Sequence, residues 1–136
     1  MGSGGSEAES PQYAANETGP VVSKRSYSIN FDTGKATFTS EGVRTMQGLK
    51  DSLAITGLFI QVDGYTDNTG SEQVNQVLSD ARAGAVKEWL QKHAPRNFPD
   101  NRFRIAGHGS QSPVATNETG AGKAANRRVE ITLMGS

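Results

Sequence analysis

An acid and an arginine in the middle of this chain, Asp67 and Arg82, have the types and spacing to hold a small charged ligand. Asp67 lies in Gly64–Gly70, a segment with the composition of a turn. Arg82 follows in a stretch whose apolar spacing is typical of a helix. A carboxylate accepts hydrogen bonds from an ammonium, and a guanidinium donates two parallel ones to a carboxylate. The pair therefore suggests a site for a zwitterion, in which an ammonium stands beside a carboxylate.

The predicted helix places further side chains beside Arg82. Asn75, Leu78 and Arg82 are spaced i, i+3 and i+7, so they share one helix face. At a rise of about 1.5 Å per residue, Asn75 and Arg82 are about 10 Å apart along the axis. The loop carrying Asp67 enters this helix after a strand, and ligands of parallel β-α units bind where such strands end. Simpler interpretations are that Asp67 is only a turn residue, that Arg82 is a solvated helix residue, or that the two form a structural ion pair.

The surrounding sequence predicts the elements that would position these residues. Apolar and polar residues alternate, or apolar residues cluster, in four predicted strands: 27–31, 58–62, 102–107 and 127–133. Helical spacing predicts one helix that Thr39 or Ser40 caps and Gly57 follows, a second between Ser71 and Pro95, and a short helical turn at 120–125. The order β-α-β-α-β-β predicts an α/β fold of the α+β two-layer type. Its sheet is four-stranded, mixed parallel and antiparallel, and covered by helices on one face.

Composition predicts one domain preceded by an arm. Residues 1–23 are rich in Gly, Ser, Glu, Asn and Pro and lack apolar periodicity, so we expect a tag and flexible linker there, and a single domain at 24–134. The formal net charge is zero, and the charges are interspersed, which argues against a polyanionic partner such as a nucleic acid. The absence of cysteine excludes disulfides and thiol catalysis. No apolar run is long enough to cross a bilayer.

Motifs for other ligand chemistry are incomplete. The segment 120–124 mimics a phosphate-binding loop, but the motif needs glycine at Asn117 and a hydroxyl at Ala124. The segment 67–72 lacks the glycine and glutamate of a calcium loop. The two histidines, His93 and His108, have no partner at zinc-ligand spacing. We therefore expect no cofactor, no metal and no catalytic residue.

Taken together, three motifs resemble those of the OmpA-like peptidoglycan-binding domain of bacterial envelope proteins, from about Ser26 to about Leu133. They are a T-D-x-x-G loop at Thr66–Gly70, an L-S-x-x-R-A helix segment at Leu78–Ala83 and an N-R-R turn at Asn126–Arg128. The resemblance implies that Asp67 and Arg82 bind diaminopimelate in the peptidoglycan stem peptide, whose far end is a free amino-acid centre. It also implies a set of pocket-lining residues: Phe31, Asp32, Thr69, Asn75, Leu78 and, at the pocket edge, Arg128.

Four positions qualify this resemblance. Tyr65 stands where many family members have histidine, and Lys123 stands where arginine is usual, which keeps the charge but loses the planar fork. A core aromatic is as reasonable an interpretation of Phe31 as a ligand contact. We interpret Arg127 as a surface strand residue.

The function that the resemblance implies is noncatalytic: binding of peptidoglycan that anchors an envelope protein to the cell wall. The expected location is the periplasm, with no nucleic-acid partner and no membrane insertion by this fragment. Two alternatives stay open. One is a small cell-wall hydrolase or peptidase-like enzyme, which would need a nucleophile and base or a metal near the same pocket. The other is a protein–protein interaction module of the envelope.

Overall fold

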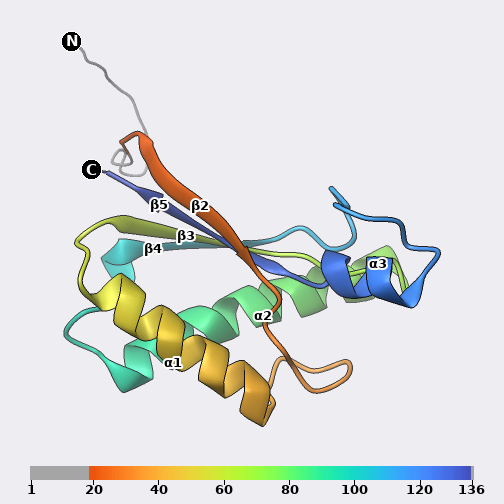
Figure 1. Ribbon diagram of the computed structural model, residues 1–136, viewed down its shortest axis with the longest axis horizontal. Coiled ribbons are helices and arrows are strands. Elements are labelled where there is room, and N and C mark those ends of the chain that lie inside the picture. Colours follow the sequence, from red (N-terminus) through yellow and green to blue (C-terminus); the bar gives the residue numbers. More distant parts are fainter. Residues whose placement is uncertain (1–18, 136) are drawn as a thin grey trace.

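A computed structural model describes residues 19–135, which form a four-stranded sheet with helices on one face (Figure 1). This confirms the predicted two-layer mixed architecture. The elements run in the order β2 (Val21–Tyr27), α1 (Ser40–Ala54), β3 (Phe59–Gly64), α2 (Glu72–His93), β4 (Phe103–Gly107), α3 (Gly120–Asn126) and β5 (Val129–Met134), with a 3₁₀ turn at Asp100–Arg102 before β4.

The strand order places the loop after β3 beside the start of β5. The sheet order is β2-β5-β3-β4, with β3 and β4 parallel and β5 antiparallel to both β2 and β3. The parallel pair is joined by α2, so β3, α2 and β4 form a β-α-β unit. Because β5 runs opposite to β3, the residues just before Val129 lie next to the residues just after Gly64. Two segments far apart in sequence thus meet at this end of the sheet.

The core lies between the sheet and the helices α1 and α2. Each helix begins at a hydroxyl cap: Thr39 Oγ1 accepts from the Gly42 amide at 3.1 Å, and Ser71 Oγ accepts from the Val74 amide at 3.1 Å. Apolar side chains at helical spacing then face alternate residues of the central strands. The buried set includes Met46, Leu49, Leu53, Ala83, Val86 and Leu90 of the helices and Ile60, Val62, Val129 and Ile131 of the strands.

Two glycines bring α2 close to the strand ends that border the Asp67 loop. A Cβ on Gly64 would lie 2.6 Å from the carbonyl oxygen of Ser79, and one on Gly107 would lie 2.3 Å from the amide nitrogen of Asp80. Any larger residue at either position would push the helix away. The approach holds the part of α2 that carries Arg82 beside the loop.

The predicted first strand at 27–31 is wrong, because the strand is β2 and ends at Tyr27. Ile29 is buried in the core, but its segment has left the sheet, and Phe31 forms only an isolated bridge with Phe38. The alternating pattern therefore reflected burial rather than ladder pairing. The first part of the predicted linker, residues 1–18, lies outside the described residues, whereas Val21–Ser23 belong to β2.

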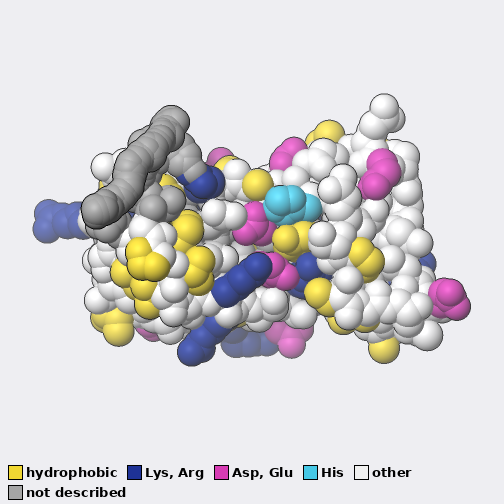
Figure 2. Space-filling model, turned by 90° about the horizontal axis from the view of Figure 1, so that it is seen from above, with side chains coloured by type: hydrophobic (Ala, Val, Ile, Leu, Met, Phe, Trp, Pro, Cys, Tyr) yellow, Lys and Arg dark blue, Asp and Glu magenta, His cyan; other side chains and the backbone are white. Residues whose placement is uncertain are grey.

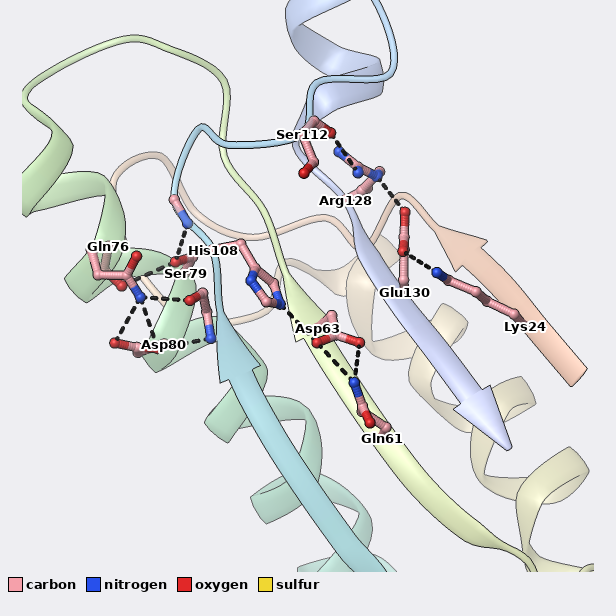
Figure 3. Close-up of polar contacts among 12 residues, drawn as sticks. Lys24, Gln61, Asp63, Gln76, Ser79, Asp80, His108, Ser112, Arg128 and Glu130 are labelled. Carbon is pink, nitrogen blue, oxygen red and sulfur yellow. Dashed lines mark hydrogen bonds and ion pairs between the residues drawn. The ribbon is translucent and has the colours of Figure 1, made fainter. Parts of the chain in front are cut away.

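The sheet face away from α1 and α2 carries polar side chains. Seen from that side, charged groups of both signs and a histidine gather near the middle of the molecule (Figure 2). On this face His108 Nε2 lies 2.8 Å from Asp63 Oδ1, and Glu130 is 2.9 Å from Arg128 Nε and 3.4 Å from Lys24 Nζ (Figure 3). No helix within residues 19–135 combines the length and apolar character that a bilayer crossing needs.

Candidate functional site

A pocket of about 970 Å³ opens where the loop after β3, the N-terminal half of α2, the segment 28–39 and α3 meet. Polar, charged and apolar side chains all line it. Seven of the eight predicted ligand-binding residues are among them: Phe31, Asp32, Asp67, Thr69, Asn75, Leu78 and Arg82.

Asp67 lies in a loop that the backbone holds in place. Gly70 has a φ of +86°, a conformation that side-chain-bearing residues rarely adopt, which explains the glycine of the T-D-x-x-G pattern. The Thr66 amide donates to the Gly109 carbonyl at 2.7 Å, and the Asn75 side chain donates to the Asp67 carbonyl at 3.4 Å. The loop is thus tied both to the segment after β4 and to α2.

The Asp67 carboxylate is buried and ionised, and groups of the protein already donate hydrogen bonds to it. Its side chain accepts from the Thr69 amide at 2.8 Å and from Arg127 Nη1 at 2.6 Å. Burial raises the pKa of Asp67, but the hydrogen bonds from Thr69 and Arg127 outweigh burial and hold the pKa below its ordinary value of 3.8. The alternative of an Asp67–Arg82 ion pair is wrong, because the partner of Asp67 is Arg127.

Arg82 is a buried cation held by carbonyl groups. The residue is 8% exposed; Nε donates to the Lys35 carbonyl at 2.9 Å, and Nη2 donates to the Asp32 carbonyl at 3.5 Å. Its guanidinium carbon lies 4.8 Å from the centre of the Phe31 ring. Burial lowers the pKa of Arg82, the charge of Arg127 lowers it further, and Asp67 partly opposes both. Across residues 19–135, the ion pairs include no carboxylate on Arg82.

The segment that covers Arg82 is a small closed loop. Phe31 and Phe38 stack with ring centres 4.8 Å apart, and Thr37 Oγ1 donates to the Asp32 carboxylate at 2.6 Å. Phe31 packs against the core while it also lines the pocket. The loop therefore presents the carbonyls of Asp32 and Lys35 to Arg82 and forms one pocket wall.

The two neighbouring arginines Arg127 and Arg128 have different surroundings. Arg127 is exposed, as predicted of a surface residue, but it lies before β5 rather than in a strand, and it also lines the pocket and pairs with Asp67. Arg128 points to the open face, where it donates to Glu130 and to the Ser112 carbonyl at 2.9 Å (Figure 3). It borders only a small adjoining cavity of about 10 Å³. Arg127 lies in the bend between α3 and β5, whereas Arg128 directly precedes β5 and reaches Glu130 of that strand.

The two positions that depart from the family pattern also have defined places. Tyr65 stacks on His108 with ring centres 4.8 Å apart and lies under the Arg128 guanidinium at 3.8 Å. The Lys123 ammonium donates to Thr69 Oγ1 at 3.3 Å, so this residue of α3 bridges to the loop that carries Asp67. The predictions from sequence did not include this bridge.

The lowered pKa of Asp67 predicts how the stability difference between the wild type and Asp67→Asn depends on pH. A group with a depressed pKa contributes stability that is fully present above its unfolded-state pKa and is lost as the pH falls through the folded-state value. We expect the wild type to be the more stable protein at pH 5–7, and the difference to shrink as the pH falls from about 4 towards 2. Urea unfolding at each pH measures this; a difference that is constant over the whole range would contradict it.

Comparisons with known proteins identify the family and the fold. Residues 30–127 match the model of the OmpA family. The chain is 39% identical over 106 residues to the "Probable lipoprotein YiaD" of Escherichia coli K12, covering 77% of this chain and 47% of the relative. It is 43% identical over 74 residues to the "Peptidoglycan-binding protein ArfA" of Mycobacterium tuberculosis H37Rv, covering 54% of this chain and 22% of the relative.

A solved structure shares the fold over most of its length. The cell wall anchor of the T6SS from Pseudomonas aeruginosa superposes with a TM-score of 0.70 at 29% identity, covering 83% of this chain and 80% of that one. The two sequence relatives, in contrast, are much longer than the part that this chain matches.

Proposed function

The chain belongs to the OmpA family, and on that premise we propose that it binds bacterial peptidoglycan through the diaminopimelate of the stem peptide. The observation that carries the proposal is the pairing of charges in one pocket. Arg82 is a buried cation without a carboxylate among the described residues, and the ionised Asp67 lines the same pocket. A buried charge without a counter-ion is costly, so a ligand that supplies a carboxylate to Arg82 is favoured.

In this proposal the free amino-acid centre of diaminopimelate lies between the two charges. Its carboxylate accepts hydrogen bonds from Arg82, and its ammonium donates to Asp67. Leu78 and Phe31 supply apolar surface for the methylene groups that lead back to the peptide. The carbonyls that hold Arg82 pre-orient its guanidinium, so little side-chain freedom is lost when the ligand binds.

The relatives support a role in wall anchoring. One carries a name that states peptidoglycan binding, and the superposed structure is described as a cell wall anchor. We propose that this chain likewise anchors an envelope protein to the wall from the periplasm, and that it acts by binding alone. A cell-wall hydrolase is the competing function, because it would use the same ligand.

The proposal predicts selective binding to wall type. Sedimentation with purified diaminopimelate-type peptidoglycan should deplete the protein from solution, whereas peptidoglycan with lysine at the third stem position should bind much less. Lysine's far end lacks the carboxylate that Arg82 would hold, and amidation of that carboxylate should weaken binding for the same reason. Equal binding to both wall types would refute the zwitterion site. Release of soluble muropeptides during the incubation would instead indicate hydrolysis.

A further inference from the structure

We propose that Arg127 is a specificity-determining residue, which occupies Asp67 in the free protein and turns to the ligand carboxylate when a zwitterion binds. This inference rests on the proposed function of the pocket. In this scheme a ligand ammonium binds Asp67 only if the same ligand carries a carboxylate that Arg127 can bind in place of Asp67. Arg127 thereby makes the site reject ligands that carry an amine alone.

The first step is the contact in the free protein. Arg127 Nη1 lies 2.6 Å from Asp67 Oδ2, while Asp67 Oδ1 accepts from the Thr69 amide. Both carboxylate oxygens are thus already hydrogen-bonded before any ligand arrives. A ligand ammonium must share or displace the Arg127 contact, which is a charge-assisted hydrogen bond and hence one of the stronger kinds.

The second step is that Arg127 faces the same space as Arg82. Both side chains line the main pocket and also the small cavity of about 10 Å³ beside it. Their charges repel, which contributes to the lowered pKa of Arg82. A ligand carboxylate at this place would contact two guanidinium groups and relieve their repulsion. The same carboxylate that pairs with Arg82 therefore also attracts Arg127 from Asp67.

The third step is the difference in freedom between the two arginines. Arg82 is 8% exposed and held by the carbonyls of Lys35 and Asp32. The Arg127 side chain is 47% exposed. Within residues 19–135, its one ion pair is with Asp67. Arg82 is therefore a stationary anchor, while Arg127 can exchange one carboxylate for another at small conformational cost.

Selectivity follows from the balance of charges. With a zwitterion, the ammonium replaces Arg127 at Asp67 and the carboxylate receives Arg127, so no charge loses its partner. With an amine alone, Arg127 loses Asp67 and gains nothing, while the repulsion between Arg127 and Arg82 persists. The amine alone must therefore compete with Arg127 for Asp67 without any compensating contact, so it is disfavoured.

Arg127→Gln separates this role from simple attraction. The probes are two synthetic stem tripeptides, Ala-γ-Glu-diaminopimelate and Ala-γ-Glu-lysine, and calorimetry measures their dissociation constants. The wild type should prefer the diaminopimelate peptide by a large factor. In Arg127→Gln the diaminopimelate peptide should bind at least about 10-fold more weakly, and the lysine peptide should bind more tightly. Both changes reduce the ratio of the two dissociation constants. Arg25→Gln, an exposed arginine of β2, is the matched control and should keep the wild-type preference.

The outcomes distinguish the two levels of the proposal. A wild type that binds neither tripeptide overturns the proposed function and this inference with it. A selective wild type whose preference is unchanged in Arg127→Gln overturns the inference alone. Equal weakening of both peptides in Arg127→Gln also overturns it, because a purely structural arginine would give that result. Weakening of the diaminopimelate peptide with no change for the lysine peptide overturns it too, because simple attraction of the ligand carboxylate would give that result. Urea unfolding of the same samples confirms that each variant is folded during the titration.

Discussion

Asp67→Ala and Arg82→Ala are each expected to reduce the binding of diaminopimelate, and of the wall that contains it, to near background. Each substitution removes one partner of a charge pair that the ligand would complete in a desolvated pocket. Such truncations typically cost about 2–5 kcal/mol, which corresponds to roughly 30- to 5,000-fold in the dissociation constant. Part of the cost arises because the ligand's own charge is left buried without a counter-ion.

The two substitutions should differ in their effect on the free protein. Asp67→Ala releases Arg127 but leaves the contacts between Arg82 and the carbonyls of Asp32 and Lys35 in place. Arg82→Ala removes those contacts and should increase amide exchange in the segment 31–38. Arg82→Lys should bind with intermediate affinity, because lysine keeps the charge but cannot form the same fork of hydrogen bonds.

Titration of diaminopimelate into each variant, together with a thermal melt, measures both effects. Both variants should stay folded because neither side chain belongs to the apolar core, and their melting temperatures should fall modestly, because Asp67→Ala loses an ion pair and Arg82→Ala loses two carbonyl contacts. A variant that binds normally would remove the direct-contact role of its residue. A variant that loses binding only in proportion to its loss of folded protein would do the same.

The pocket was predictable where its residues are close in sequence. Asp67, Asn75, Leu78 and Arg82 lie in one loop and the helix that follows, so turn chemistry and helical periodicity are enough to bring them together. Arg127 was harder to place, because it lies in the bend between α3 and β5 and its contact with Asp67 joins residues 60 positions apart. The alternation of 127–133 predicted an exposed strand residue, and that pattern does not reveal that an exposed side chain also lines a pocket.

Other features depend on contacts that the sequence does not display. The carbonyl of Lys35 reaches Arg82 from a separate loop, and a backbone acceptor leaves no trace in residue type. The edge strand β2 exposes most of its side chains, so Val21–Tyr27 lacks the apolar alternation that marks a half-buried strand. Ile29 supplied that signal instead, from a segment that has already left the sheet.

Truncation of Arg102, which lies outside the pocket, should strongly reduce the free energy of unfolding. Arg102 is 8% exposed and joins three segments of the chain: Nε donates to the Leu58 carbonyl at 2.7 Å, Nη1 to the Asn97 carbonyl at 2.8 Å and Nη2 to the Leu53 carbonyl at 3.1 Å. Nη2 also donates to Thr56 Oγ1 at 2.7 Å. One guanidinium thus donates hydrogen bonds to carbonyls at the end of α1, just before β3 and in the loop before β4.

Arg102→Ala removes four hydrogen bonds donated by a charged group in a partly buried region. A hydrogen bond to a charged group contributes about 1.5–3 kcal/mol, so we expect the free energy of unfolding to fall by about 3 kcal/mol or more. Arg102→Lys should recover only part of this, because one ammonium cannot reach acceptors on three segments. Arg44→Ala, an exposed arginine on α1, is the matched control and should stay within about 0.5 kcal/mol of the wild type.

Urea unfolding followed by circular dichroism measures the three variants under one set of conditions. The pocket is built by the other end of the sheet, so Arg102→Ala protein that remains folded should still bind diaminopimelate with wild-type affinity. The two substitutions should therefore have opposite effects on binding and stability. Arg102→Ala should lower the free energy of unfolding and leave ligand binding intact, whereas Arg82→Ala should abolish ligand binding and leave the core folded. A fall in stability no larger than that of Arg44→Ala would show that solvent replaces the guanidinium at little cost, and that Arg102 does not hold the three segments together.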